Sequence, residues 1–228
     1  MNDEIHFENV SVEFSGREVL RDLSLDLDER RIAVIGSNGS GKSTFARMLN
    51  GLVTPTRGEV RVHGVDPARQ PKEVRRRVGF VFSNPDAQII MPTVAEDVAF
   101  SFRGRGLSRT EVQERVTAAL DRFGLGEHAD APAQTLSGGQ KQLLALCAVL
   151  IREPGLVVAD EPTAYLDASN SRRIARFLLD EMPQQLVIVT HDPRLAARCD
   201  IAVRFEAGAL VDRGDPAAVI ARYEEEQL

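Results

Sequence analysis

A glycine-rich segment near the start of the sequence has the spacing of a phosphate-binding loop. Residues 36–43 read glycine, four residues, then glycine-lysine-serine. Glycines let successive backbone N–H groups converge on phosphate oxygens, and a helix that follows points its positive end at the same place. The pattern predicts that Lys42 reaches the β- and γ-phosphates of a nucleoside triphosphate and that Ser43 binds Mg²⁺. The residues predicted to bind nucleotide are Gly36, Ser37, Asn38, Gly39, Ser40, Gly41, Lys42, Ser43 and Thr44. This motif alone leaves a kinase, a GTPase and a motor equally open.

Two further segments end in side chains suited to phosphate chemistry. The apolar run 156–159 is followed by Asp160 and Glu161, and the apolar run 186–190 is followed by His191. Asp160 is predicted to hold Mg²⁺, and Glu161 to orient and polarise the attacking water. His191 is predicted to contact the γ-phosphate, because buried parallel strands bring their carboxyl ends to one edge of a sheet. A solvated strand end is the plain alternative for each.

The most specific pattern is Leu-Ser-Gly-Gly-Gln at residues 136–140. Ser137 and Gln140 have the spacing of a capping box at the start of an apolar helix. Gly138 and Gly139 leave backbone N–H groups uncovered, so hydroxyl, amides and helix dipole together make an anion site. The alternative, a simple loop before a core helix, would explain the capping residues but not the two glycines that follow Ser137.

In order along the chain, these motifs make the sequence similar to the ATP-binding cassette (ABC) ATPases, and the similarity covers essentially its whole length. The resemblance implies a P-loop NTPase (RecA-like) core that binds ATP and Mg²⁺ and hydrolyses ATP. It implies that residues 137–140 contact the γ-phosphate of ATP held by the opposite subunit of a head-to-tail dimer. It also places Phe14 against adenine and Asp167 at the subunit interface near the opposite phosphate loop.

Residues 84–88 (NPDAQ) and 93–100 (TVAEDVAF) look like the energy-coupling-factor branch of vitamin and metal-ion importers. In that branch the ATPase docks onto a transmembrane coupling subunit, and another membrane protein binds the substrate. The overall match is nearest to the ATPases of biotin importers. Where the family has a glutamine that senses Mg²⁺ and the γ-phosphate, this chain has Ser83, and Gln88 is the residue expected to substitute in part.

These side chains need a framework of alternating strands and helices. Period-two alternation over 5–27 predicts antiparallel strands, and apolar runs predict strands at 32–35, 59–62, 78–82, 156–159, 186–190 and 201–205. Helical patterns start at Lys42, Ser108 and Ser137. The prediction is one α/β ABC domain: a core with an N-terminal antiparallel β-subdomain over 1–83 and 154–228, and an inserted helical subdomain over 84–153.

Composition narrows the class of protein. The 228 residues carry a net charge of −6, which argues against a protein that coats nucleic acid. Two cysteines in apolar segments, Cys147 and Cys199, predict no disulfide. No segment has the length of apolar residues that a membrane span needs. The resemblance to importer ATPases implies a peripheral location at the cytoplasmic face of the membrane. Rival classes are a DNA-maintenance ATPase, which would carry long heptads, a ribosome-associated protein with two cassettes, and an ATP sensor, which could dispense with Glu161.

Overall fold

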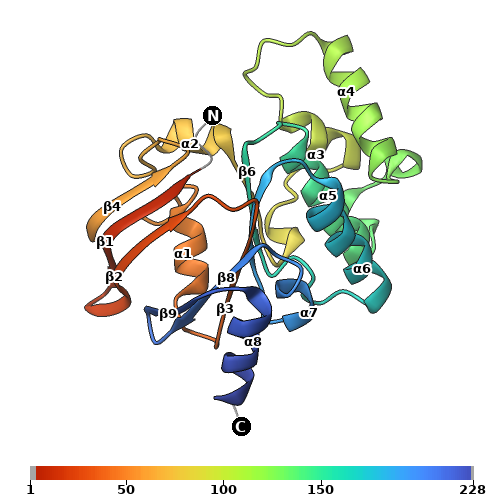
Figure 1. Cartoon of the computed structure of the whole chain (residues 1–228). Coiled ribbons are helices and arrows are strands. Elements are labelled where there is room, and N and C mark those ends of the chain that lie inside the picture. Colours follow the sequence, from red (N-terminus) through yellow and green to blue (C-terminus); the bar gives the residue numbers. More distant parts are fainter. Residues whose placement is uncertain (1–3, 227–228) are drawn as a thin grey trace.

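The computed structural model describes residues 4–226, which form two sheets with helices between and around them (Figure 1). The smaller sheet is antiparallel, with strand order β2-β1-β4. The larger sheet has the order β5-β6-β7-β3-β8-β9, and only β9 runs antiparallel to its neighbour. The strands are β1 (Ile5–Phe14), β2 (Arg17–Leu27), β3 (Arg31–Gly36), β4 (Arg57–Val62), β5 (Val78–Val81), β6 (Leu156–Asp160), β7 (Gln185–Val189), β8 (Ile201–Glu206) and β9 (Ala209–Gly214).

The two sheets share a hydrophobic core in which helix α1 (Lys42–Met48) lies between them. Phe45 of α1 stacks on Phe7 of β1 with ring centroids 4.9 Å apart. On its other side the Phe45 ring lies 5.2 Å from that of Phe205 on β8. All three rings are almost fully buried, so one aromatic column ties the antiparallel sheet to the strands that carry the phosphate loop.

The predicted strands are all present, with ends that differ by one or two residues. Strands β3, β6 and β7 are buried along their whole length, as expected of parallel strands covered on both faces. Strand β9 was not predicted, because its pattern of half-buried and exposed residues carries no strong apolar signal. It pairs with β8 at the sheet edge, where one face remains open to solvent.

Helices α3 (Val94–Phe100), α4 (Arg109–Arg122) and α5 (Gly138–Leu150) pack together beside the larger sheet (Figure 1). The capping boxes predicted for α4 and α5 are both formed. These helices share one continuous core with β6, β7 and helix α6, so the division at residues 84 and 153 stays a prediction. The remaining helices are α2 (Pro71–Arg77), α6 (Ala168–Arg176), α7 (Pro193–Ala196) and α8 (Pro216–Glu225), with short turns of helix at 85–87, 126–128, 133–135 and 177–181.

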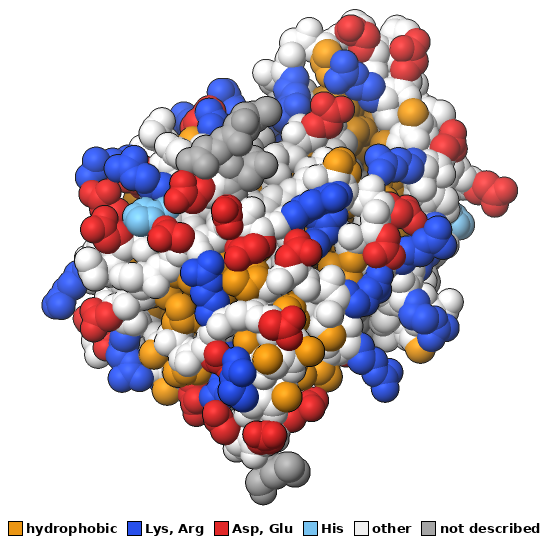
Figure 2. All heavy atoms as spheres, in the orientation of Figure 1, with side chains coloured by type: hydrophobic (Ala, Val, Ile, Leu, Met, Phe, Trp, Pro, Cys, Tyr) orange, Lys and Arg blue, Asp and Glu red, His pale blue; other side chains and the backbone are white. Residues whose placement is uncertain are grey.

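Cys147 and Cys199 are both buried and free, as predicted. Within residues 4–226, every helix is too short or too polar to cross a bilayer. Acidic and basic side chains are interspersed over the face in Figure 2, and this face carries no continuous basic band.

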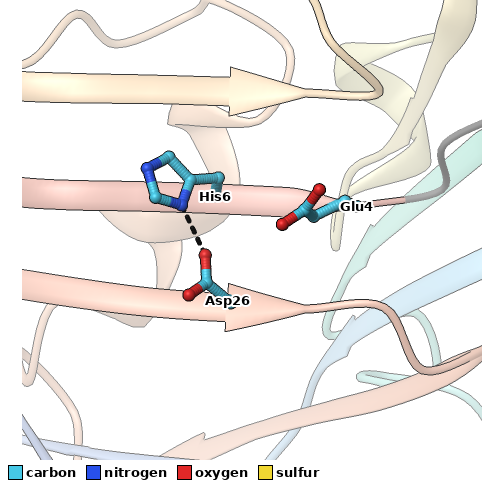
Figure 3. Close-up of side chains that lie close together, drawn as sticks. All are labelled: Glu4, His6 and Asp26. Carbon is cyan, nitrogen blue, oxygen red and sulfur yellow. Dashed lines mark hydrogen bonds and ion pairs between the residues drawn. The ribbon is translucent and has the colours of Figure 1, made fainter.

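On the solvent side of the antiparallel sheet, His6 of β1 lies directly opposite Asp26 of β2 (Figure 3). The His6 Nδ1 atom bonds to the Asp26 carboxylate, and Glu4 points toward the same pair. The Asp26 hydrogen bond raises the pKa of His6, against a smaller opposite effect of burial. One ligand atom from each of the three residues lies within 4.8 Å of the others, but the bond to Asp26 already engages the imidazole nitrogen that faces the carboxylate.

We expect the His6–Asp26 pair to stabilise the sheet only while His6 is protonated. Because its folded-state pKa is raised, the contribution is complete below the ordinary histidine value of about 6.5 and is lost as pH rises through the folded value. An exposed pair of this kind contributes about 0.2–1 kcal/mol. A double-mutant cycle of His6→Ala and Asp26→Asn, measured by urea unfolding, should show coupling at pH 6 and none at pH 9. Equal coupling at both values would contradict the assignment.

Candidate functional site

The phosphate loop runs from the end of β3 to the first residue of α1, as predicted. Gly36 has a φ of +139°, and a Cβ built there would lie 2.1 Å from the carbonyl oxygen of Phe205. Only glycine therefore fits where the loop leaves the strand. The loop hydroxyl of Ser40 is buried and has no hydrogen-bond partner among the described residues. A buried hydroxyl without a partner is costly, and a phosphate oxygen would satisfy it.

The side chain of Lys42 forms hydrogen bonds with the backbone of its own loop. Its Nζ donates to the carbonyl oxygens of Gly36 (2.7 Å) and Ser37 (2.8 Å). Burial lowers the pKa of Lys42, and the nearby Glu161 and Asp160 carboxylates act in the opposite direction. The ammonium group is thus kept in a water-poor place where its charge acts strongly on an anion.

Asp160 ends β6 next to the loop, and its Oδ1 accepts a hydrogen bond from Ser43 Oγ at 3.2 Å. Burial raises the pKa of Asp160, and the Ser43 hydrogen bond, Arg47 and Lys42 oppose that effect. A hydroxyl and a carboxylate at this distance are hard oxygen ligands of the type that Mg²⁺ takes together with phosphate oxygens and water. The residues present therefore fit the ion predicted from the sequence.

Glu161 and His191 come from the neighbouring strands β6 and β7 and meet over the loop. His191 Nδ1 lies 2.8 Å from Glu161 Oε2, with the histidine 73% exposed and the glutamate 21% exposed. Glu161 has a left-handed backbone, φ +51°, and its N–H donates to Val189 O. Non-glycine residues in this region are uncommon, and strain of this kind clusters at functional sites.

Two adjoining cavities follow the line of the loop. One of about 220 Å³ lies over Asn38–Thr44 and reaches Val19, Glu161 and Val189. The other, of about 750 Å³, is lined by Gly36, Ser37, Asn38, Ser83, Glu161, Thr163, Ala164, Tyr165, Ser171, His191, Asp192 and Tyr223. The structure thus brings together the predicted catalytic residues from three strand ends. It also adds Tyr223 of α8, which no local pattern indicates.

Gln88 lies between β5 and α5, and its predicted role as a partial substitute for the glutamine of the family stays a prediction. Its side-chain oxygen accepts from the N–H of Phe82 (3.2 Å), and its side-chain nitrogen donates to the Ala145 carbonyl (3.3 Å). The Gln88 amide therefore joins the end of β5 to α5 and is absent from the residues that line the two cavities. Ser83, which follows β5, lines the larger of the two cavities.

The second predicted half-site lies on α5. Ser137 Oγ accepts from the Gln140 N–H at 3.3 Å, and Gln140 Oε1 accepts from the Ser137 N–H at 2.9 Å. Ser137 and Gly138 are exposed, so this helix start presents its hydroxyl and amides to solvent. None of residues 137–140 lines the phosphate-loop cavities.

Two other predicted residues also lie outside those cavities. Asp167 caps α6 by accepting from the N–H groups of Ser169 and Asn170, both at 2.8 Å. Phe14 stands at the end of β1 with 49% of its surface exposed. Their roles at a subunit interface and against adenine stay predictions.

Comparison with known proteins decides the family. A model of the ABC transporter family matches residues 20–164. The chain belongs to the ABC transporter family. It is 44% identical to the biotin transport ATP-binding protein BioM of Rhizobium etli over 97% of this chain and 98% of that one. It is 37% identical to the energy-coupling factor transporter ATP-binding protein EcfA1 of Latilactobacillus sakei, over 91% and 76% of the two chains.

Among solved structures, cbiO1 from Clostridium perfringens, part of the ABC transporter complex cbiONQ, superposes on the ABC chain with a TM-score of 0.85. The two share 29% identity over 98% of this chain and 93% of that one. The predicted family and fold class are confirmed, and the protein is an ABC-type ATPase that binds and hydrolyses ATP.

Two glycines of the phosphate loop should respond differently to alanine. Gly36→Ala meets the Phe205 carbonyl, whereas a Cβ at Gly39 (φ +77°) has no neighbour within 4 Å. We expect Gly36→Ala to lower the free energy of unfolding by about 2–5 kcal/mol and Gly39→Ala by about 1–2 kcal/mol. Urea unfolding of both variants measures this difference. Equal losses would show that strand β8 does not constrain the loop.

Proposed function

We propose that two copies of this ATPase close over ATP and Mg²⁺ and that hydrolysis reopens them to drive an energy-coupling-factor importer. The observation that carries the proposal is the separation of the two half-sites. The phosphate loop opens at the carboxyl edge of the larger sheet, while Ser137 is exposed at the start of α5 and lines neither cavity of that loop. An exposed helix start with an anion-binding cap needs an anion from outside its own chain.

Each residue of the loop has a role that follows from its position. The backbone N–H groups of the glycine-rich turn and the Ser40 hydroxyl bind phosphate oxygens. Lys42 moves from the Gly36 and Ser37 carbonyls to the β- and γ-phosphates, because a phosphate anion is the stronger partner. Ser43 and Asp160 would hold Mg²⁺, which neutralises charge on the phosphate oxygens.

Glu161 orients the attacking water and accepts hydrogen bonds from it, in line with the γ-phosphate. His191, 2.8 Å from Glu161, holds that carboxylate in place and presents its other ring nitrogen to the γ-phosphate. Ser83 lines the same cavity on the β5 side, where its hydroxyl reaches the phosphate through water.

In this proposal ATP joins the two copies, because its γ-phosphate is bound by the phosphate loop of one chain and by the Ser137 cap of the other. Hydrolysis removes this shared charge, and with it the differential affinity that favours the closed dimer. Tyr165 lines the larger cavity, and Asp167 caps α6 two residues further along the chain. Both residues belong to the contact between the chains in this proposal.

The importer branch rests on segment 84–100 and on the relatives. A cavity of about 500 Å³ is lined by Asp86, Ile89, Ile90, Met91, Pro92, Ala133 and Gln134. Ile90 is 62% exposed there, which suits an apolar contact with a transmembrane coupling subunit. BioM and cbiO1 belong to transporters by name, and biotin is the proposed cargo, captured by a separate membrane protein. The ATPase would then sit at the cytoplasmic face of the membrane.

Replacing Glu161 by glutamine should trap the closed state. We expect Glu161→Gln to bind ATP normally, to hydrolyse it about 10²-fold or more slowly, and to double its mass by light scattering only when ATP is present. Adding Ser137→Arg to the same chain should block the dimer while each chain still binds ATP. A Glu161→Gln protein that stays monomeric with ATP would contradict the proposal that both chains bind the same ATP.

Biotin uptake tests the importer branch. Cells whose only copy of this chain carries Lys42→Ala should take up labelled biotin no faster than cells without the chain. Lys72→Ala removes a lysine from the exposed side of α2 and is the matched control, with uptake at the level of the unmodified chain. Equal biotin uptake in cells with and without the unmodified chain would exclude biotin as the cargo.

A further inference from the structure

The side chain of Gln140 is held from two sides, and only one side belongs to the capping box. Gln140 Oε1 accepts from the Ser137 N–H at 2.9 Å. Gln140 Nε2 lies 2.9 Å from Nε2 of His128, in a partly buried contact twelve residues away in the sequence. His128 ends the short helical turn Gly126–His128 that follows α4.

The hydrogen-bond pattern fixes which atom donates. A backbone N–H can only donate, so the atom of Gln140 that faces Ser137 N must be the oxygen. The amide nitrogen therefore faces His128 and donates a hydrogen to it. Nε2 of His128 must then carry a lone pair, which places the imidazole proton on Nδ1.

The loop that carries His128 is itself anchored. The His128 N–H donates to Leu125 O at 2.9 Å, and Leu125 is fully buried. The next residues cap the start of α3, because Ala129 O accepts from Ala95 N (2.9 Å) and Ala131 O accepts from Val94 N (3.2 Å). These carbonyls satisfy N–H groups that have no partner inside α3. The imidazole is thus presented to Gln140 from a backbone with fixed supports.

We propose that His128 is a positioning residue for the ATP-binding cap of α5, which it serves by accepting a hydrogen bond from Gln140. Without that acceptor, the Gln140 amide is free to turn toward water, and the Ser137 N–H and hydroxyl lose their fixed direction. Since Ser137 faces the ATP of the opposite chain, closure then needs more ATP. This inference rests on the proposed two-chain grip, and it goes beyond it by assigning a residue outside the motif.

The test uses the full chain carrying Glu161→Gln and measures the ATP concentration, in the presence of Mg²⁺, that gives half of the closed dimer. Loss of one hydrogen bond predicts that His128→Ala raises this concentration about 2- to 10-fold. His128→Gln places an uncharged acceptor oxygen near the position of Nε2 and should restore the value to within about 2-fold. ATP binding by the separate chains, measured with Ser137→Arg present, should be the same in all variants.

The chain offers a control, because His63 Nε2 donates to Gln185 Oε1 (2.7 Å) in a histidine–glutamine hydrogen bond of the opposite direction that involves no residue of α5. His63→Ala should affect stability and leave closure unchanged. Closure by His128→Ala at the parental ATP concentration would overturn the proposal, and so would equal impairment by alanine and glutamine.

A second measurement separates this inference from the proposed function. Hydrogen exchange of the backbone at residues 137–141, without nucleotide, should be faster in His128→Ala and normal in His128→Gln. If the Glu161→Gln parent fails to dimerise, the two-chain proposal fails, and this exchange pattern still decides the role of His128. Unchanged exchange in His128→Ala would overturn that role.

Discussion

The structure depends on keeping one ammonium group where water is scarce. Lys42 is buried, its pKa is lowered by that burial, and its charge is balanced by two carbonyl oxygens and by the carboxylates at the end of β6. Such a cation is costly without an anion and correspondingly strong toward one. The fully buried strands, the aromatic column through Phe45 and the glycine against Phe205 all serve to hold this group in place.

The two carboxylates beside Lys42, Asp160 and Glu161, differ in burial and in their hydrogen-bond partners. Asp160 is more buried, carries a raised pKa and bonds to Ser43, which suits it to share a cation. Glu161 is held by a left-handed backbone and by His191, with part of its surface open to the cavity, which suits it to meet a water molecule. The two roles proposed for these adjacent acids thus rest on a single turn after β6, which separates their surroundings.

Much of this site could be predicted from the sequence, because its chemistry is encoded in short spacings. The phosphate loop, the pair Asp160–Glu161 and the capping box of α5 depend on residues within a few positions of one another. The contacts of Gln88 could not be predicted in this way. Its type and place suit a phosphate sensor, but its amide is taken by Phe82 and Ala145, and Ala145 lies 57 residues away. Tyr223 in the cavity and His128 beside Gln140 escape for the same reason, since each depends on contacts between separate elements. Strand β9 forms a local hairpin with β8 and escapes because its half-buried pattern carries no strong apolar signal.

The loop at residues 126–133 connects the start of α3 to the start of α5. The loop 126–133 supports His128 and thereby the cap of α5, and its carbonyls also cap α3. Its last residue, Ala133, lines the cavity proposed for the membrane partner. A movement of α3 by that partner would therefore act on the same backbone that positions Gln140. Because a hydrogen bond on this route is either made or broken, a small shift at the cavity would have a discrete effect at Ser137, where the opposite chain's ATP is proposed to bind.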